Sequence, residues 1–266
     1  MDFETIILKK EEGIATVILN RPEIGNATNP QMYNELSSAF EDIAGDEAVR
    51  VMIITGAGRG FCGGGDTGEM GEGSIYTRLD IEALGQRIRQ TTQKPIISLR
   101  KLEIPTIAMV NGFAVGGGFD IACACDIRIG SERARFTNAF VRVGLATEWG
   151  IDYYLPRIVG LGKASEILYT GRWVEAEEAE RIGLLNTLVP AGDLERETME
   201  LARQLAKGPP IAIKLTKKLV KEGLETDRET TLETSAEYQA IAIASQDHRE
   251  GVAAWKENRE AVYRGI

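Results

Sequence analysis

The chain has few of the residues that build metal sites and nucleophilic triads. Its 266 residues include three cysteines, Cys62, Cys123 and Cys125, and a single histidine, His248. Because the cysteines form no C-x-x-C pair, we expect no zinc site and assign no metal ligand. A Ser-His-Asp triad would depend on His248, which lies in a charged segment typical of an exposed turn. We expect the cysteines to be reduced and buried.

Positive charge and long apolar runs are also scarce. The chain has 31 lysines and arginines against 40 aspartates and glutamates, a net charge of −9. Nucleic-acid-binding proteins show the reverse balance, and an anionic ligand would need a local basic cluster here. No apolar run approaches the roughly 20 residues of a membrane span, and the acidic start of the chain does not resemble a signal peptide. We expect a cytoplasmic protein that binds neither nucleic acid nor a membrane.

Short apolar runs alternate with longer segments of helical period. The apolar runs predict strands over residues 5–8, 14–19, 51–55, 106–110, 126–129 and 134–136. Apolar residues at helical spacing predict helices over residues 30–44, 79–99 with a break at Pro95, 119–125, 152–158, 163–169, 176–182, 193–206, 210–222 and 230–259. The predicted class is α/β, with β-β-α units followed by a helical C-terminal region.

Two glycine-rich loops each follow a predicted buried strand. Residues 61–66 read Phe-Cys-Gly-Gly-Gly-Asp, and residues 111–118 read Asn-Gly-Phe-Ala-Val-Gly-Gly-Gly. Glycine lets the backbone approach a ligand, and two inward amides from separate strands make an oxyanion hole. Two tight turns without a ligand are the alternative. Residues 58–63 also fit G-x-G-x-x-G, but no strand ending in an acid follows, so a dinucleotide site is not favoured.

Several segments follow one another in a fixed order along nearly the whole chain. They are residues 20–27 (Asn-Arg-Pro-Glu-Ile-Gly-Asn-Ala), residues 60–66 with Met70, residues 104–118 and the C-terminal residues 251–259. In that order they resemble the crotonase (enoyl-CoA hydratase/isomerase) superfamily. The resemblance implies a crotonase-like spiral of repeated β-β-α units over residues 1–200. Residues 201–266 would form a helical region that covers the active site and contributes to trimerisation.

The resemblance also implies a substrate and a binding site. The substrate would be an acyl-CoA thioester, whose enolate is stabilised by the backbone amides of Gly63 and Gly117. Gly63 stands where the family usually has alanine. The residues expected to line the substrate are Phe140, Trp149, Gly64, Gly65, Asp66 and Met70. The family implies no cofactor beyond the coenzyme A of the substrate, and it implies a homotrimer or a dimer of trimers.

The acids of the site distinguish between reactions. At the two carboxylate positions of the hydratases this chain has Asp120 and Phe140, and phenylalanine cannot act as a general base. Glu148 lies in a segment that resembles the carboxylate segment of single-carboxylate enoyl-CoA isomerases. One carboxylate suffices for a 1,3 proton shift from C2 to C4. Apolar walls from Phe140 and Trp149 would raise the pKa of Glu148 and exclude water.

Other interpretations of the same residues remain open. Glu148, with Thr147 as N-cap, also fits an acid at a helix start, and Asp120 fits the same role in its own helix. Phe140 and Trp149 also fit a hydrophobic core. A hydratase could use Asp120 together with Glu148, and a hydrolase, decarboxylase or lyase of a cyclic or aromatic acyl-CoA would share the enolate. A non-catalytic protein would bind the ester without exchanging its C2 proton.

Overall fold

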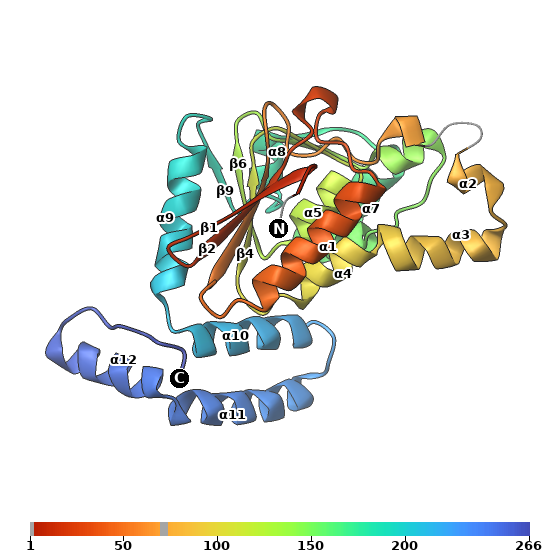
Figure 1. Ribbon diagram of the computed structural model, residues 1–266. Coiled ribbons are helices and arrows are strands. Elements are labelled where there is room, and N and C mark those ends of the chain that lie inside the picture. Colours follow the sequence, from red (N-terminus) through yellow and green to blue (C-terminus); the bar gives the residue numbers. More distant parts are fainter. Residues whose placement is uncertain (1–2, 70–73) are drawn as a thin grey trace.

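A six-stranded sheet forms the centre of the computed structural model, which describes residues 3–69 and 74–266 (Figure 1). The strands lie in the order β1 (Ile6–Glu11), β2 (Ile14–Leu19), β3 (Val51–Gly56), β4 (Thr106–Val110), β6 (Ile127–Ser131) and β9 (Thr187–Val189). Only the β1–β2 pair is antiparallel among these neighbours. Every residue of β3 is buried, which explains its apolar run without alternation.

A second, three-stranded sheet lies beside the first. It consists of β5 (Phe113–Val115), β7 (Arg135–Thr137) and β8 (Val174–Glu175), with β5 parallel to β7. β5 lies inside the segment predicted as a continuous glycine-rich loop. A single bridge joins Cys62 to Ala114 of β5, and another joins Thr28 to Gly65. The second sheet therefore brings the two glycine-rich segments together.

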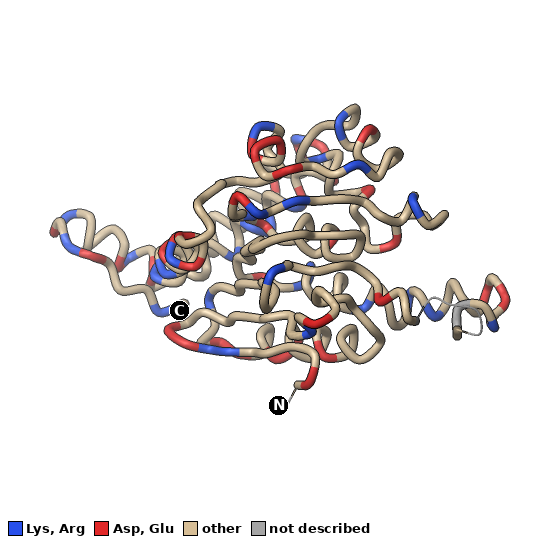
Figure 2. The backbone as a smooth tube through the Cα atoms, turned by 90° about the horizontal axis from the view of Figure 1, so that it is seen from above, with Lys and Arg blue, Asp and Glu red and all other residues tan. Residues whose placement is uncertain are grey.

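Helices cover both faces of the central sheet. α1 (Pro30–Ala44) and α4 (Lys94–Lys101) lie on one face, and α9 (Leu194–Lys207) lies on the other (Figure 1). α1 begins as predicted, because the side chain of Asn29 accepts a hydrogen bond from the amide of Met32. α5 (Gly117–Ala124) is buried along its whole length. Charged residues lie mainly on the outer helices and loops (Figure 2).

The remaining helices complete the α/β fold. They are α2 (Ile75–Arg78), α3 (Ile81–Arg87), α6 (Ile151–Val159), α7 (Leu161–Thr170), α8 (Ala176–Arg181), α10 (Pro210–Glu222), α11 (Arg228–Ala244) and α12 (Gln246–Glu257). The predicted α/β class is confirmed. So is the expectation of reduced, buried cysteines, and burial raises the pKa of the Cys62 thiol to about 12.

Two predicted helices are interrupted. The segment predicted as one helix over 79–99 contains α3, a π-helical turn at Ile88–Thr92 and α4. Pro95 lies in the first turn of α4, where a missing backbone donor does no harm. The predicted helix 230–259 breaks at Ser245, whose hydroxyl caps α12 by accepting from the amide of His248.

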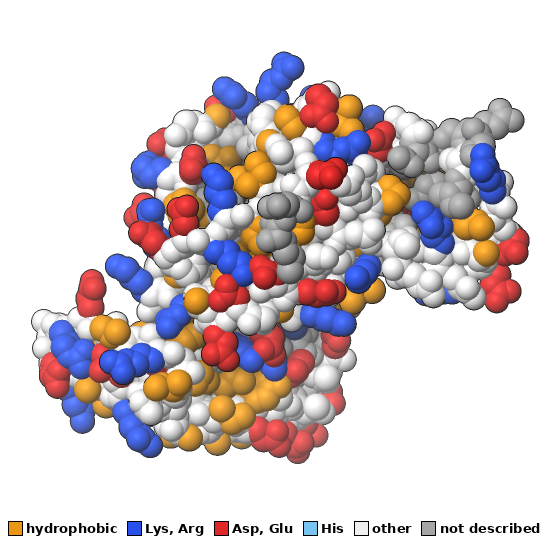
Figure 3. Space-filling model, in the orientation of Figure 1, with side chains coloured by type: hydrophobic (Ala, Val, Ile, Leu, Met, Phe, Trp, Pro, Cys, Tyr) orange, Lys and Arg blue, Asp and Glu red, His pale blue; other side chains and the backbone are white. Residues whose placement is uncertain are grey.

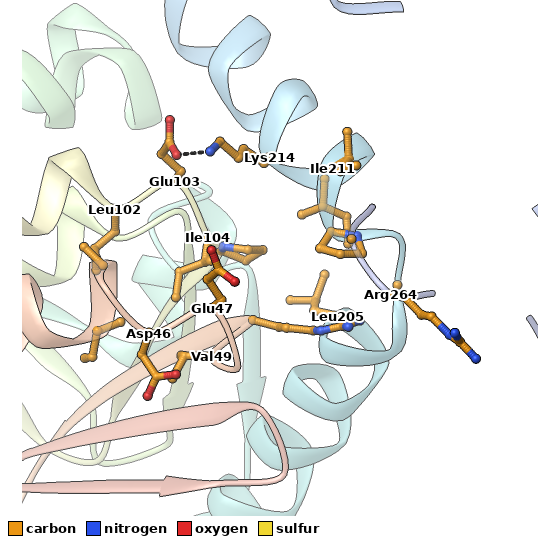
Figure 4. Close-up of a pocket in the computed structure, with 18 of the residues that line it drawn as sticks. Asp46, Glu47, Val49, Leu102, Glu103, Ile104, Leu205, Ile211, Lys214 and Arg264 are labelled. Atoms are coloured by element: carbon orange, nitrogen blue, oxygen red, sulfur yellow. Dashed lines mark ion pairs between the residues drawn. The ribbon is translucent and has the colours of Figure 1, made fainter. Parts of the chain in front are cut away.

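The C-terminal helices lie beside the core (Figure 1), and neither α10 nor α11 has a buried residue. Lysines of α10 attach it to the core: Lys217 pairs with Asp126 at 2.6 Å, and Lys214 pairs with Glu103. Figure 4 shows the latter pair beside a cavity of about 580 Å³ between the core and α10. Hydrophobic side chains are exposed over this region (Figure 3); they include Leu224, Leu232, Ile241, Ile243, Val252 and Trp255.

Candidate active site

The two glycine-rich segments lie against each other. The amide of Val115 donates to the carbonyl of Cys62 at 2.9 Å. A methyl group on Gly64, whose φ is +85°, would lie 2.8 Å from the carbonyl oxygen of Val115. A methyl group on Gly118 would lie 2.5 Å from the carbonyl oxygen of Cys62. The glycines are therefore needed for the close approach of the two backbones.

The structure contradicts the predicted role of Gly63. Its amide donates to the carbonyl of Gly25 at 2.8 Å, so it is not free to bind a ligand. Within residues 3–69 and 74–266, the amides of Gly65 and Gly117 have no hydrogen-bond acceptor. Gly117 is the first residue of α5, where amides lack a partner within the helix. The amides of Gly65 and Gly117 are therefore the ones left available to a ligand, and the oxyanion role predicted for Gly117 stays a prediction.

Two aromatic rings border the start of α5. A methyl group on Gly117 would lie 3.5 Å from the ring of Trp149, and one on Gly116 would lie 3.5 Å from the ring of Phe140. Trp149 also meets Tyr33 edge to face, with ring centroids 5.4 Å apart. Phe140 and Trp149 are only 9% and 2% exposed. They combine a core position with close contact to the candidate site.

Glu148 is half-buried and lies next to Trp149. α6 begins only at Ile151, with Gly150 at the N-cap and Asp152 as the acid of the first turn. The alternative in which Thr147 caps a helix that starts at Glu148 is therefore wrong. Burial raises the pKa of the Glu148 carboxyl above its ordinary value. In the described part of the chain this carboxyl has no hydrogen bond or ion pair, so it is free to exchange a proton.

Asp120 lies in the first turn of α5 and is 0% exposed. Its Oδ1 accepts a hydrogen bond from the amide of Ile151 at 3.0 Å, and its Oδ2 has no partner among the described residues. Burial raises the pKa of this carboxyl well above 3.8, and the charges of Glu148 and Asp152 act in the same direction. The other titratable groups near it are Cys62, Cys123 and Tyr154. Oδ1 of Asp120 thus contacts the start of α6, and the catalytic role predicted for Asp120 stays a prediction.

Asp66 stabilises the first glycine-rich loop, residues 61–66, through two contacts of its carboxylate. Its carboxylate pairs with Arg21 at 3.1 Å and accepts from the amide of Gly68 at 3.0 Å. The side-chain amide of Asn26 donates to the carbonyls of Ala57 and Gly60, both at 2.9 Å. The segment 20–27 therefore builds the loop and does not itself supply the chemistry. Met70, which was predicted to line the substrate, lies outside the described residues.

No motif in the sequence predicted that Gln93 would contact the segment that carries Glu148. The side-chain amide of Gln93 donates to the main-chain carbonyl of Glu148 at 2.8 Å. Gln93 lies between the π-helical turn and α4, 55 residues away in sequence from Glu148. Only the break at Pro95 marks this position in the sequence.

Among residues 3–69 and 74–266, no group of three or more histidine, cysteine, aspartate or glutamate side chains is placed to hold a metal ion. No helix in this part of the chain is long and apolar enough to cross a membrane.

Known proteins match the chain over almost its full length. Residues 9–265 match the family described as enoyl-CoA hydratase/isomerase. The chain is 36% identical to the crotonyl-CoA hydratase of Syntrophomonas wolfei over 262 residues, which is 98% of each protein. It is 32% identical to the 1,2-epoxyphenylacetyl-CoA isomerase of Escherichia coli, over 98% of this chain and 99% of that one. A solved enoyl-CoA hydratase from Bacillus anthracis superposes with a TM-score of 0.92 at 30% identity, covering 99% and 100% of the two chains.

Proposed function

Because the chain belongs to the enoyl-CoA hydratase/isomerase family, we propose that it converts a 3-enoyl-CoA thioester into the 2-enoyl isomer. One observation carries the proposal: Glu148 is a half-buried carboxyl without a partner among residues 3–69 and 74–266, and no second carboxyl accompanies it at the position of Phe140. The similarity to an isomerase from Escherichia coli supports the same reaction class.

The thioester oxygen would accept hydrogen bonds from the amides of Gly65 and Gly117. These donors stabilise the negative charge that forms on the oxygen when C2 loses its proton. Because Gly117 is the first residue of α5, an oxygen bound to its amide would also lie at the positive end of a helix dipole. The close packing of the two loops holds both donors in place before the substrate binds.

Glu148 would then move one proton between two carbons. Its carboxylate removes a proton from C2, which gives a carboxylic acid and a dienolate. The electron pair of the broken C–H bond forms the C1–C2 double bond of the dienolate, and the negative charge moves to the thioester oxygen. When the carbonyl forms again, the C1–C2 pair becomes the C2–C3 double bond, and the C3–C4 pair takes the proton from Glu148 at C4. The carboxylate is restored, and no water, metal ion or redox cofactor takes part. Burial raises the pKa of Glu148, which brings it closer to that of a group able to both accept and return a proton near neutral pH.

Hydrogen exchange at C2 tests the proposal. A 3-enoyl-CoA incubated with the protein in heavy water should form the 2-enoyl product, and it should gain deuterium to the extent that the Glu148 acid exchanges its proton with solvent before returning it. Glu148→Gln should lower both rates by about 100-fold or more. The matched control is Glu177→Gln, because Glu177 is exposed in α8. Near wild-type turnover in Glu148→Gln would remove Glu148 from the mechanism. A protein that binds the ester with neither product formation nor exchange would be a binding protein only.

Hydration is the second candidate, and the similarity to a crotonyl-CoA hydratase favours it. It requires a carboxylate to activate water, and in this structure the carboxyl of Asp120 contacts the amide of Ile151 and is shielded from solvent. Crotonyl-CoA separates the two reactions, since only a hydratase converts it into 3-hydroxyacyl-CoA. Mass spectrometry of the products of cyclic and aromatic thioesters tests the hydrolase, decarboxylase and lyase alternatives.

We further propose that the chain assembles as a homotrimer or a dimer of trimers through its C-terminal helices. Apolar side chains exposed on α11 and α12 support this assembly, and Trp255 is 88% exposed. Sedimentation should give a multiple of the 29.1 kDa chain that is divisible by three. Trp255→Glu should shift the protein to smaller species, whereas Lys256→Glu should not. A monomeric wild-type protein would exclude the assembly.

A further inference from the structure

The segment that carries Glu148 has no regular secondary structure. Residues 145–150 connect the 3-10 turn Ala139–Val143 to α6. Neither a strand nor a helix therefore fixes the position of the Glu148 carboxyl. Its position depends on contacts that the neighbouring main chain makes with other elements.

Gln93 holds this segment on the side of α4. Its Nε2 donates to the main-chain oxygen of Glu148 at 2.8 Å. The backbone of Gln93 is itself fixed, because its amide donates to the carbonyl of Ile88 at 2.9 Å at the end of the π-helical turn. Such turns are rare and often occur at functional sites.

Asp120 holds the same segment on the side of α5. Its Oδ1 accepts from the amide of Ile151 at 3.0 Å, three residues after Glu148. Asp120 also lies three residues after Gly117, within the same helical turn. One turn of α5 therefore carries both a proposed donor to the thioester oxygen and the carboxyl that holds the Glu148 segment. Between these two contacts, the ring of Trp149 packs against Gly117.

We infer that Gln93 and Asp120 are positioning residues that set where the Glu148 carboxyl stands relative to the amide of Gly117. The inference rests on the proposed function, because it assigns these side chains no chemistry of their own. Both act through the main chain of residues 148–151. Proton transfer from C2 needs the carboxyl and the bound carbonyl at a fixed spacing, and a misplacement of about 1 Å can lower a rate by about 100-fold.

Three variants test the inference with isomerisation and C2 exchange as readouts. Gln93→Met removes a donor at similar volume, and Asp120→Leu removes an acceptor while keeping the same number and branching of side-chain heavy atoms. Each should lower kcat by about 10-fold to 100-fold with KM changed by less than about threefold. Asp120→Asn keeps an oxygen that accepts from Ile151 and should restore kcat to within about threefold of wild type. Gln90→Met is the matched control, because Gln90 lies exposed in the same turn.

Wild-type kcat in both Gln93→Met and Asp120→Leu would overturn the inference. So would an Asp120→Asn variant that loses as much rate as Asp120→Leu, since the carboxyl would then have to supply a proton. If Asp120→Leu does not fold, Gln93→Met against Gln90→Met decides the question alone. Glu148→Gln separates this inference from the proposed function: if it loses exchange while the positioning variants retain it, only the inference fails.

Discussion

Asp120→Asn should change how the stability of the protein depends on pH. The carboxyl of Asp120 is fully buried, which raises its pKa well above the ordinary 3.8. As the pH rises past the ordinary value, the unfolded chain releases this proton while the folded protein keeps it. Stability is therefore lost with rising pH until the folded-state pKa is reached. Below the ordinary value both states hold the proton, and the carboxyl adds no pH dependence.

The size of this effect follows from proton linkage. One proton held by the folded protein alone changes the free energy of unfolding by about 1.4 kcal/mol per pH unit. Asparagine cannot ionise, and it keeps an oxygen for the amide of Ile151. The stability of Asp120→Asn relative to wild type should therefore rise with pH by up to about 1.4 kcal/mol per unit, starting near pH 4.

Guanidinium unfolding at several pH values, at one fixed protein concentration, measures this difference. Glu177→Gln is the control, because the Glu177 side chain is exposed in α8 and its charge is not among those that raise the pKa of Asp120. Its stability relative to wild type should show no comparable rise in the same window. A difference between Asp120→Asn and wild type that does not vary with pH would refute the reasoning, since the buried carboxyl would then ionise as easily when folded as when unfolded.

Three further results are expected. Gly64→Ala should destabilise the protein by about 1 to 3 kcal/mol in thermal unfolding, because a φ of +85° strains any residue with a side chain. Gly162→Ala is the control: a methyl group there would have no atom within 4 Å, so this variant should be neutral or stabilising. Phe140→Glu should raise the hydration of crotonyl-CoA by roughly 10-fold or more, with Phe140→Gln as control, and no gain would mean that Phe140 does not prevent hydration. As the pH is lowered, kcat should fall with a midpoint above 4.5, because Glu148 must be ionised to accept the C2 proton and burial raises its pKa. A midpoint at or below 4.5 would contradict the role of Glu148 as the base.

The sequence pattern correctly predicted helices and strands that are marked by residues within the element itself, such as a cap or a continuous apolar run. The helix over residues 30–44 has its own cap and apolar stripe, and the strand over 106–110 is a continuous apolar run, so both appear where expected. β8, with two residues, and β9, with three, depend on pairing with distant strands, and no local pattern marks them. Ser245 showed no break because the residues on both sides of it favour helix.

Which amide of the first glycine-rich loop is available to an oxyanion could not be predicted from the sequence. Gly63 and Gly65 are equivalent in the sequence, because both belong to a run of three glycines. The difference between them lies in the carbonyl of Gly25, which accepts from Gly63 at 2.8 Å. Gly25 turns that carbonyl with a φ of +67° after the 3-10 turn Pro22–Ile24. A hydrogen bond to Gly25, nearly 40 residues earlier in the sequence, thus leaves the amide of Gly65 available and that of Gly63 not. The spacing of glycines within the loop gives no information about this contact.

The surroundings of Glu148 bear on which product a dienolate would give. An added water molecule needs polar partners to hold and activate it, typically two to four. The position that carries a second carboxyl in the hydratases carries Phe140, whose ring faces Gly116, and Oδ1 of the fully buried Asp120 accepts from the amide of Ile151. Trp149 closes the same side with an indole nitrogen that has no partner among the described residues. Under the proposed function, a dienolate in these surroundings meets the Glu148 acid that has just taken the C2 proton, and return of that proton to C4 completes an isomerisation.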